Sequence, residues 1–183
     1  IFRIGPIVRK QYSAALRIDP VARAVVMLSG SAFGTPVSFN RTTYPVKIDI
    51  IGRDRPEGWI EREEVTFHGK IKDTYPLLKN ADIAIVNGGF SAVSEIFWMK
   101  KPLVVVPVPN HAEQWVNART IERLGVGLMA TQDNYEEVML QAIERIEEFR
   151  TAYTQLTEME DGAAQASQAI FNLAFYGKRD GKS

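Results

Sequence analysis

Short apolar runs rich in β-branched residues recur along this chain, and each is followed by a turn signal or by a segment with helical spacing. The five runs are Val25–Ser29, Val46–Ile51, Val65–His68, Ile83–Asn87 and Leu103–Pro107. They are continuous rather than alternating, which is typical of strands covered on both faces, as in a parallel sheet. The pattern therefore predicts five buried parallel strands.

Five further segments carry apolar residues at helical spacing. They are Asp73–Asn80, Ser91–Lys100, Ala112–Leu124, Asn134–Glu148 with Asn134 as the N-cap, and Ala163–Tyr176. Strands that alternate with helices at this spacing predict βαβ units. We therefore expect an α/β fold, a Rossmann-like open parallel sheet with helices on both faces.

The 183 residues are enough for one globular domain with a sizeable core. We expect that domain to span residues 10–176, with a flexible tail at 177–183. The opening, residues 1–9, is interrupted by Gly5-Pro6 and does not resemble a core strand. It is interpreted either as the remnant of an interdomain linker or as an ordinary irregular N-terminus.

Composition excludes several classes of protein. Lys and Arg number 22, as do Asp and Glu, which argues against a nucleic-acid binder with a broad basic surface. There is no Cys, and hence no disulfide framework, thiol nucleophile or thiolate metal site. The longest apolar run, around Leu103–Val106, is far shorter than the roughly 20 residues that cross a bilayer, and no signal peptide pattern opens the chain. The default expectation is a cytoplasmic protein.

The sharpest candidate for binding chemistry is Asn87–Glu95, in which two glycines follow a strand and directly open a helix. Gly88 and Gly89 allow a positive φ or a close approach of the backbone to a ligand. The next amides, at the positive end of the helix dipole, form an anion site, and Ser91 either caps the helix or donates to a phosphate. Glu95, one turn further on the same face, offers a carboxylate to ribose hydroxyls. The alternative is a tight turn, an N-cap and a first-turn acid, and the turn alone does not separate the two.

Two other loops are expected at the same edge of the sheet. In Pro107–Ala118, Glu113 and Gln114 occupy the first turn of a helix and can hold sugar hydroxyls. The alternative is helix capping, with Asn110 or His111 at the start. The loop at Gly30-Ser31 follows the first strand and can supply amides or a hydroxyl to the same anion, or is an ordinary glycine-rich turn.

The two histidines do not predict a metal centre. His68 and His111 are far apart and have no carboxylate pair at ligand spacing, so we expect no metal site. His68 ends a strand beside Gly69, which suits a rim or capping role, whereas His111 lies next to Glu113 and either touches the ligand or caps the helix. The chain also has no Gly-x-Ser-x-Gly elbow and no Gly-Lys-Ser/Thr phosphate loop, which excludes the corresponding hydrolases and P-loop proteins.

Together these motifs resemble the donor site of the GT-B glycosyltransferases, in the branch of the MurG-type and UDP-glucuronosyl or UDP-glucosyl transferases. The resemblance rests on Asn87–Glu95, Lys101-Pro102 and Glu113-Gln114-x-x-Asn117-Ala118, and on the similarity of Ile4–Ile7 to an interdomain linker. It covers nearly the whole chain. The spacing between the two main motifs makes it more specific than either motif alone.

The resemblance implies the C-terminal, nucleotide-sugar-binding domain of such an enzyme. The resemblance implies that the diphosphate contacts Gly88, Gly89 and Ser91, and that the ribose contacts Glu95. It implies that the donor sugar contacts Glu113 and Gln114. The backbone around Phe67–Ile71 would frame the base, which is commonly uracil in this family. The full set of expected donor-site residues is Gly30, Ser31, His68, Asn87, Gly88, Gly89, Phe90, Ser91, Glu95, His111, Glu113 and Gln114. The donor, a UDP-sugar or another nucleotide sugar, is a substrate, and we expect no separate cofactor.

Three positions depart from the family pattern. Asn87 stands where many relatives have a His near the phosphates. Lys100 replaces the usual Gly after the helix, and Pro36–Pro45 is a poor version of the family's first helix.

The prediction is therefore transfer of a hexosyl group from a UDP donor to an unknown acceptor, without a metal. In this family the catalytic base usually lies on an N-terminal acceptor-binding domain, so the isolated chain is expected to bind donor without efficient turnover. Alternatives are a subunit of a bipartite transferase, a nucleotide-sugar epimerase of the same architecture, or a non-catalytic interaction domain. No nucleic acid partner is expected, and no membrane-binding surface is evident.

Overall fold

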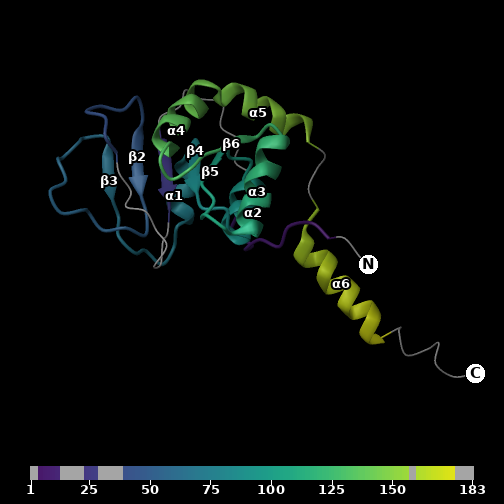
Figure 1. Cartoon of the computed structure of the whole chain (residues 1–183). Coiled ribbons are helices and arrows are strands. Elements are labelled where there is room, and N and C mark those ends of the chain that lie inside the picture. The colour runs from purple at the N-terminus through teal and green to yellow at the C-terminus, as the bar shows by residue number, and fades with distance from the viewer. Residues whose placement is uncertain (1–3, 13–22, 29–38, 157–159, 176–183) are drawn as a thin grey trace, which may run out of the picture.

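A six-stranded parallel sheet forms the centre of the protein (Figure 1). The computed structural model describes residues 4–12, 23–28, 39–156 and 160–175. The strands are β1 (Arg23–Met27), β2 (Lys47–Ile50), β3 (Val65–Phe67), β4 (Ile83–Val86), β5 (Leu103–Val105) and β6 (Gly127–Met129). Their order is β3-β2-β1-β4-β5-β6, and every neighbouring pair is parallel. The expected Rossmann-like α/β fold is confirmed.

Strands β2 to β5 lie within the predicted apolar runs, and β1 overlaps the first run but starts two residues before it. Strand β6 was not predicted. This strand, Gly127-Leu128-Met129, contains no β-branched residue, whereas each of the other five contains at least one. A Cβ at Gly127 would overlap the carbonyl oxygen of Leu103 on β5. The glycine therefore allows two strand backbones to lie close together, a need that only the paired strand reveals.

Three helices cover one face of the sheet. They are α1 (Tyr75–Asn80), α2 (Phe90–Trp98) and α3 (Ala112–Arg123). Crossovers between parallel strands are right-handed, so the connections β3–β4, β4–β5 and β5–β6, which progress in one direction across the sheet, place their helices on the same face. Val93, Ile96 and Ile121 of these helices pack against the strands as part of one buried cluster.

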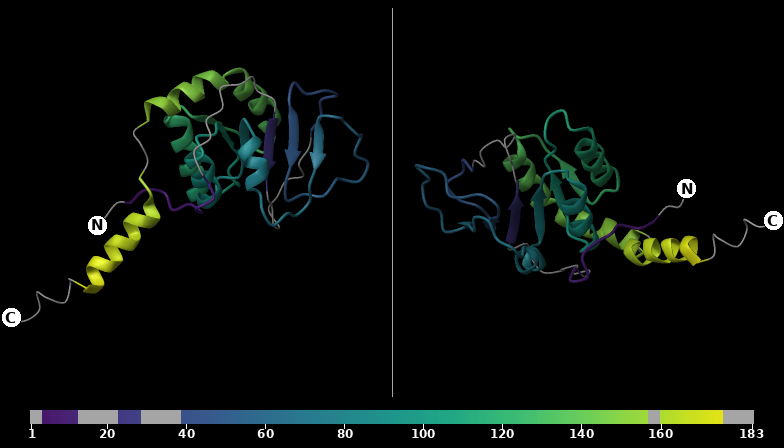
Figure 2. Two further views of the ribbon diagram at one scale, coloured as in Figure 1. Left: turned by 180° about the vertical axis from the view of Figure 1, so that it is seen from behind. Right: turned by 90° about the horizontal axis from the view of Figure 1, so that it is seen from below.

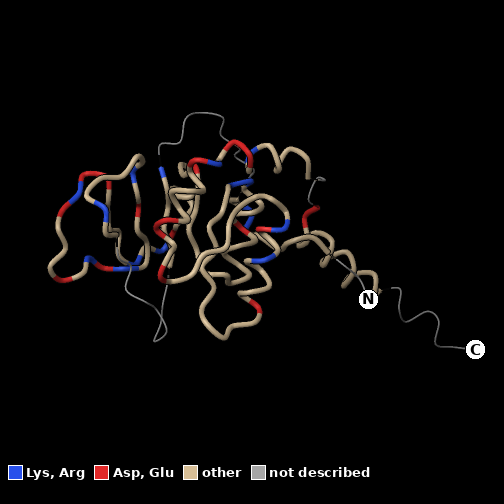
Figure 3. The backbone as a smooth tube through the Cα atoms, turned by 45° about the horizontal axis from the view of Figure 1, so that its top comes forward, with Lys and Arg blue, Asp and Glu red and all other residues tan. Residues whose placement is uncertain are grey.

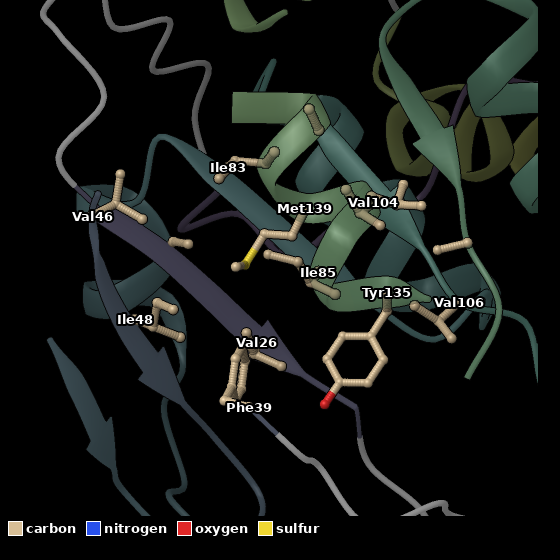
Figure 4. Close-up of a cluster of buried hydrophobic side chains, with 14 of the residues drawn as sticks. Val26, Phe39, Val46, Ile48, Ile83, Ile85, Val104, Val106, Tyr135 and Met139 are labelled. Atoms are coloured by element: carbon tan, nitrogen blue, oxygen red, sulfur yellow. The ribbon is translucent and has the colours of Figure 1, made fainter. Parts of the chain in front are cut away.

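The opposite face is covered mainly by α4 (Tyr135–Glu144). Tyr135 and Met139 of this helix lie over Val26, Ile85 and Val106 of the central strands and strand ends (Figure 4). Alternate residues of β1, β4 and β5 thus enter two separate clusters. This is the covering on both faces that continuous apolar runs predict.

The segment Asn134–Glu148, predicted as one helix, is divided between two helices. The chain bends at Arg145 (φ −97°, ψ 14°), where α4 ends, and continues as α5 (Ile146–Gln155). The start of α5, with Phe149, belongs to the cluster under α4, whereas Tyr153 is buried in the cluster on the other face. The bend therefore carries the chain from one face to the other, as the arc of α4 and α5 in Figure 1 shows.

The connection between β1 and β2 has no helix over its described part. Residues 39–46 are irregular and are held by the Glu136 carboxylate of α4, which accepts from the backbone amides of Asn40 and Arg41 and from the Tyr44 hydroxyl at 2.7 Å. Phe39, Tyr44 and Tyr135 pack edge to face beneath it. In the described part of this connection, an aromatic cluster therefore covers the sheet.

The last described helix, α6 (Gly162–Phe175), extends away from the sheet domain (Figure 2). It is attached near its start, where the Gly162 amide donates to the Pro6 carbonyl oxygen and Gln165 accepts from the Gly5 amide. Further along the helix, four large apolar side chains are exposed: Ile170, Phe171, Leu173 and Phe175.

The charges of the described chain are mixed in sign (Figure 3). Short segments of both signs are scattered along the tube, and the whole chain has a net charge of zero. No helix in the described ranges is both long and apolar enough to cross a membrane.

Candidate nucleotide-sugar site

The sheet has one topological switch point, between β1 and β4. The chain leaves β1 toward β2 and leaves β4 toward β5, so the loops after these neighbouring strands diverge to opposite sides. In open α/β sheets, ligands bind in the crevice that such diverging loops create beyond the carboxyl ends of the strands. The β4–α2 loop, Asn87-Gly88-Gly89, lies at this point. Its counterpart after β1 contains Gly30 and Ser31, which lie outside the described residues.

The first turn of α2 presents free amides at this crevice. Gly89 is the N-cap, and the amides of Phe90, Ser91 and Ala92 have no acceptor among the described residues. Phe90 and Ser91 are exposed. Ser91 is therefore not the helix cap considered from the sequence, because α2 starts one residue earlier. Three amides at a helix N-terminus form a site for an anion.

The two glycines serve different purposes, and neither adopts a positive φ. A Cβ on Gly88 would lie 2.5 Å from the backbone oxygen of Gln114, so this glycine lets the loop pack against α3. A Cβ on Gly89 would meet nothing within 4 Å. The open side of the loop is therefore at Gly89, where the chain can approach a ligand closely.

Asn87 is held by the neighbouring strand. Its Nδ2 donates to the carbonyl oxygen of Val106 at 3.0 Å, while its buried Oδ1 has no partner among the described groups. An unpaired acceptor suits a hydroxyl or amide donor better than a phosphate oxygen. This is the physical consequence of the Asn that replaces the family's His.

Glu95 is paired with the N-terminal segment. Nε and Nη2 of Arg9 contact its two carboxylate oxygens at 2.6 and 2.9 Å. This hydrogen bond raises the pKa of the Arg9 guanidinium above its ordinary value. The segment is fixed further by Tyr12, which is buried and accepts a hydrogen bond from the Trp98 indole at its carbonyl oxygen. A ribose that uses Glu95 must share or displace this ion pair.

The predicted sugar-binding pair opens α3. Glu113 is exposed in the first turn, and Gln114 uses its Oε1 to accept from the Val108 amide at 3.0 Å, which fixes the β5–α3 loop. His111 occupies the N-cap position, but its side chain makes no capping hydrogen bond and is exposed. Because Gly88 touches Gln114, the structure brings the two motifs into direct contact.

His68 lies apart from these residues, beyond β1 and β2. Its Nε2 is 2.7 Å from Oδ1 of the buried Asp49, whose Oδ2 accepts from Arg23 at 2.8 Å. The His68 imidazole is therefore hydrogen-bonded to the carboxylate of Asp49 on β2. The adjacent Gly69 has φ 59°, which turns the chain at the end of β3.

Two residues with clear positioning contacts were not assigned individual roles from the sequence. Asn117 donates from Nδ2 to the Gly88 carbonyl oxygen at 2.8 Å and so ties the glycine loop to α3. Arg9 had no local signal at all, since it reaches Glu95 across 86 residues of sequence. Asn117 is part of the recognised motif. It follows Gln114 by three residues, just under one helical turn, and this spacing indicated that the two side chains lie on the same face of α3.

In the described ranges, no group of three or more His, Asp or Glu side chains is arranged to hold a metal ion. The candidate anion site at the start of α2 consists of backbone amides.

Fold and site together define a Rossmann-like domain of the kind that forms the C-terminal half of GT-B glycosyltransferases. Residues 55–172 match the glycosyltransferase family 28 C-terminal domain, and the chain belongs to this family. An uncharacterised glycosyltransferase of Methanosarcina acetivorans is 35% identical over an alignment 159 positions long, which covers 80% of this chain and 41% of that protein. The UDP-N-acetylglucosamine–N-acetylmuramyl-(pentapeptide) pyrophosphoryl-undecaprenol N-acetylglucosamine transferase of an Exiguobacterium species is 26% identical over 88% of this chain and 45% of its own length.

Solved structures share the fold at lower sequence identity. MurG of Acinetobacter baumannii has a TM-score of 0.60 at 16% identity, covering 85% of this chain and 51% of that one. The glycosyltransferase SnogD of Streptomyces nogalater has a TM-score of 0.60 at 17% identity, with 92% and 48% covered. The chain thus spans about half the length of the proteins it matches.

Proposed function

We propose that this domain binds the donor nucleotide sugar of a metal-independent glycosyltransferase, and that the donor is a UDP-hexose. The carrying observation is the β4–α2 loop at the switch point, with the free amides of Phe90, Ser91 and Ala92 beside Gly89 and one turn before Glu95. The related Exiguobacterium enzyme, named for a UDP-N-acetylglucosamine donor, supports the choice of UDP.

In the proposed reaction, an acceptor hydroxyl or amine attacks the anomeric carbon of the donor sugar. A new bond forms from that carbon to the acceptor atom, and the bond to the diphosphate oxygen breaks. The nucleoside diphosphate leaves with the electron pair, and the acceptor proton passes to a general base. The amides of α2 stabilise the negative charge that develops on the leaving diphosphate.

The other half of the enzyme, an N-terminal acceptor-binding domain or a separate subunit, is proposed to supply that base. The exposed apolar side chains Ile170, Phe171, Leu173 and Phe175 support a partner of this kind, because they belong to α6, which extends away from the sheet domain. A cluster of exposed large apolar residues is typical of an interaction surface.

The direct test is a titration of the purified chain with UDP, GDP and dTDP, read by calorimetry and by thermal stabilisation. A ligand that binds only the folded state stabilises it by about 2.7 kcal/mol at a concentration of 100 times Kd. We expect UDP to bind most tightly. If no nucleoside diphosphate binds, the proposal is wrong.

A charge variant locates the diphosphate. Gly89→Asp places a carboxylate where a Cβ meets no neighbour, so the fold tolerates it, whereas its charge repels the diphosphate. We expect Gly89→Asp to weaken UDP binding at least tenfold relative to Gly89→Asn, which has nearly the same size without the charge. Equal affinities for the two variants would place the diphosphate elsewhere.

A further inference from the structure

A cavity of about 720 Å³ lies beside the proposed donor site. It is an open pocket between the loop from β5 to α3 and the loop from β6 to α4, beyond the carboxyl ends of two neighbouring strands. Its volume is within the range of small-molecule sites, about 300–1,000 Å³. It lies to one side of the switch point, and of the described residues expected at the donor site, His111 alone lines it.

The lining of this cavity is predominantly apolar. Pro107, Pro109 and Met129 contribute to its walls, and α3 adds Trp115 and Val116, whose side chains are more than half exposed. No Lys or Arg lines it, and its one acid is Asp133. A diphosphate would find no lysine or arginine in this cavity to balance its charge. The transfer of an apolar group from water into the cavity, by contrast, is favourable.

Hydrogen bonds within the β5–α3 loop shape this wall in advance. The Val108 amide donates to Gln114, the His111 amide donates to the Val108 carbonyl oxygen at 3.2 Å, and Asn110 adopts a left-handed φ of 62° between them. The wall is thus fixed by contacts within the protein and exists without a ligand.

Gln114 joins the cavity to the anion site. On one side its Oε1 holds Val108 of the cavity wall, and on the other its backbone touches Gly88 of the glycine loop. A donor sugar held at the first turn of α3 would therefore lie between the two spaces. A molecule in the cavity is positioned to present a group to that sugar.

We propose that this cavity binds the apolar body of the acceptor substrate, an alcohol or amine whose reacting group points toward Gln114. The inference rests on the proposed glycosyl transfer. It adds the chemical class of the acceptor, a molecule with an apolar part large enough to fill the cavity, and assigns part of its binding to this domain.

Straight-chain primary alcohols from butanol to decanol are suitable probes, because each has an acceptor-like hydroxyl and a graded apolar tail. Ligand-observed NMR titration of the chain should show Kd falling about fourfold per added methylene until the cavity is filled. Saturating UDP should leave alcohol binding intact, since donor and acceptor must be bound together. Displacement of the alcohol by UDP would instead make the cavity part of the donor site and overturn the proposal.

Two variants of the cavity lining and a matched control complete the test. Val116→Asp places a charge in the wall and Ala112→Trp fills the space from its rim, and each should weaken decanol binding at least tenfold without changing UDP affinity. Ile170→Asp, an exposed aliphatic position on α6, should change neither. If no alcohol binds, or if neither lining variant weakens alcohol binding, the proposed acceptor site is wrong. The proposed donor function still stands in that case as long as the chain binds UDP. Loss of UDP binding by the unmodified chain would overturn both.

Discussion

Glu95 has a structural partner in Arg9 and is proposed to have a second partner in the donor ribose. Its carboxylate accepts two hydrogen bonds from Arg9, but the Arg9 side chain is 51% exposed, so the pair contributes little to stability. The carboxylate retains lone pairs, since an ionised carboxylate has about four acceptor positions. A role in ribose binding therefore remains compatible with the ion pair.

Replacing Glu95 by Ala should weaken UDP binding about tenfold and leave the fold intact, because the hydrogen bonds to the ribose hydroxyls are lost. Arg9→Ala is the matched control, since it removes the same ion pair but keeps the carboxylate. Calorimetry should show unchanged or tighter UDP binding for Arg9→Ala. A loss equal to that of Glu95→Ala would mean that the ion pair, and not the ribose contact, supports binding.

Lys100 occupies a position that glycine usually fills. It has a left-handed φ of 55° just after α2, where its amide donates to the Phe97 carbonyl oxygen and the Lys101 amide to the Ile96 carbonyl oxygen. These two bonds form a Schellman motif, so the helix ends as the family's glycine would end it. The sequence left this geometry in doubt, and the structure shows that the motif forms with lysine.

Lys100 lowers the stability of the folded state at this position, because its backbone adopts a left-handed conformation that glycine adopts more easily. Lys100→Gly should raise the free energy of unfolding by about 0.5–1 kcal/mol, because the left-handed region is disfavoured for a residue with a Cβ. Urea denaturation measures this change. An unchanged or lower stability would show that contacts of the lysine side chain offset the strain.

At the scale of elements, the contact between the glycine loop and α3 holds the site together. Gly88 packs on the backbone of Gln114, and Asn117 bonds the Gly88 carbonyl oxygen. The two family motifs, separate in the sequence, are therefore one structural unit. Their spacing predicted proximity but not the direct backbone contact, which depends on how α2 and α3 pack.

Gly88→Ala should lower the free energy of unfolding by about 1–3 kcal/mol, because the added methyl overlaps the Gln114 backbone. Gly89→Ala, one residue further, should change it by less than about 0.5 kcal/mol, since its Cβ meets open space and its φ of −62° suits any residue. Urea denaturation of the pair isolates the close contact. Equal effects of the two substitutions would contradict it.

At the scale of the whole molecule, buried polar groups join distant elements. The buried Lys101 donates from Nζ to the carbonyl oxygens of Lys79 and Ala81 at the end of α1, and its own carbonyl oxygen accepts from the Tyr153 hydroxyl of α5. Lys101-Pro102 was recognised as part of a family motif, and the structure shows that Lys101 binds α1 and α5 to the sheet.

Buried tyrosines make the fold sensitive to alkali. Burial raises the pKa of Tyr153, and it also raises the pKa values of Tyr12 and Tyr44, so the folded chain keeps these phenols protonated while the unfolded chain ionises them near pH 10. The unfolded state then binds fewer protons, and stability present below pH 10 falls as pH rises above it.

Urea denaturation between pH 8 and pH 11 should show this loss, with a slope of up to about 1.4 kcal/mol per pH unit for each such tyrosine. Tyr153→Phe should be less stable at pH 8, since the hydrogen bond to Lys101 is lost, but its stability should fall less steeply above pH 10. A slope identical to that of the unsubstituted chain would show that Tyr153 does not titrate on unfolding.

The sequence by itself determined five of the six strands, most of the helices, the fold class and the two motifs that mark the family. These features depend on local periodicity, turn residues and short spacings, which are properties of neighbouring positions. The tertiary structure decided the rest. It alone shows β6, where Gly127 packs against the Leu103 carbonyl oxygen, and the bend at Arg145 that lets α5 reach the second core cluster. It also shows the pairing of Glu95 with Arg9 and the apolar cavity beside Gln114. Each of these depends on contacts between residues far apart in the chain, and no local pattern records which distant groups will meet.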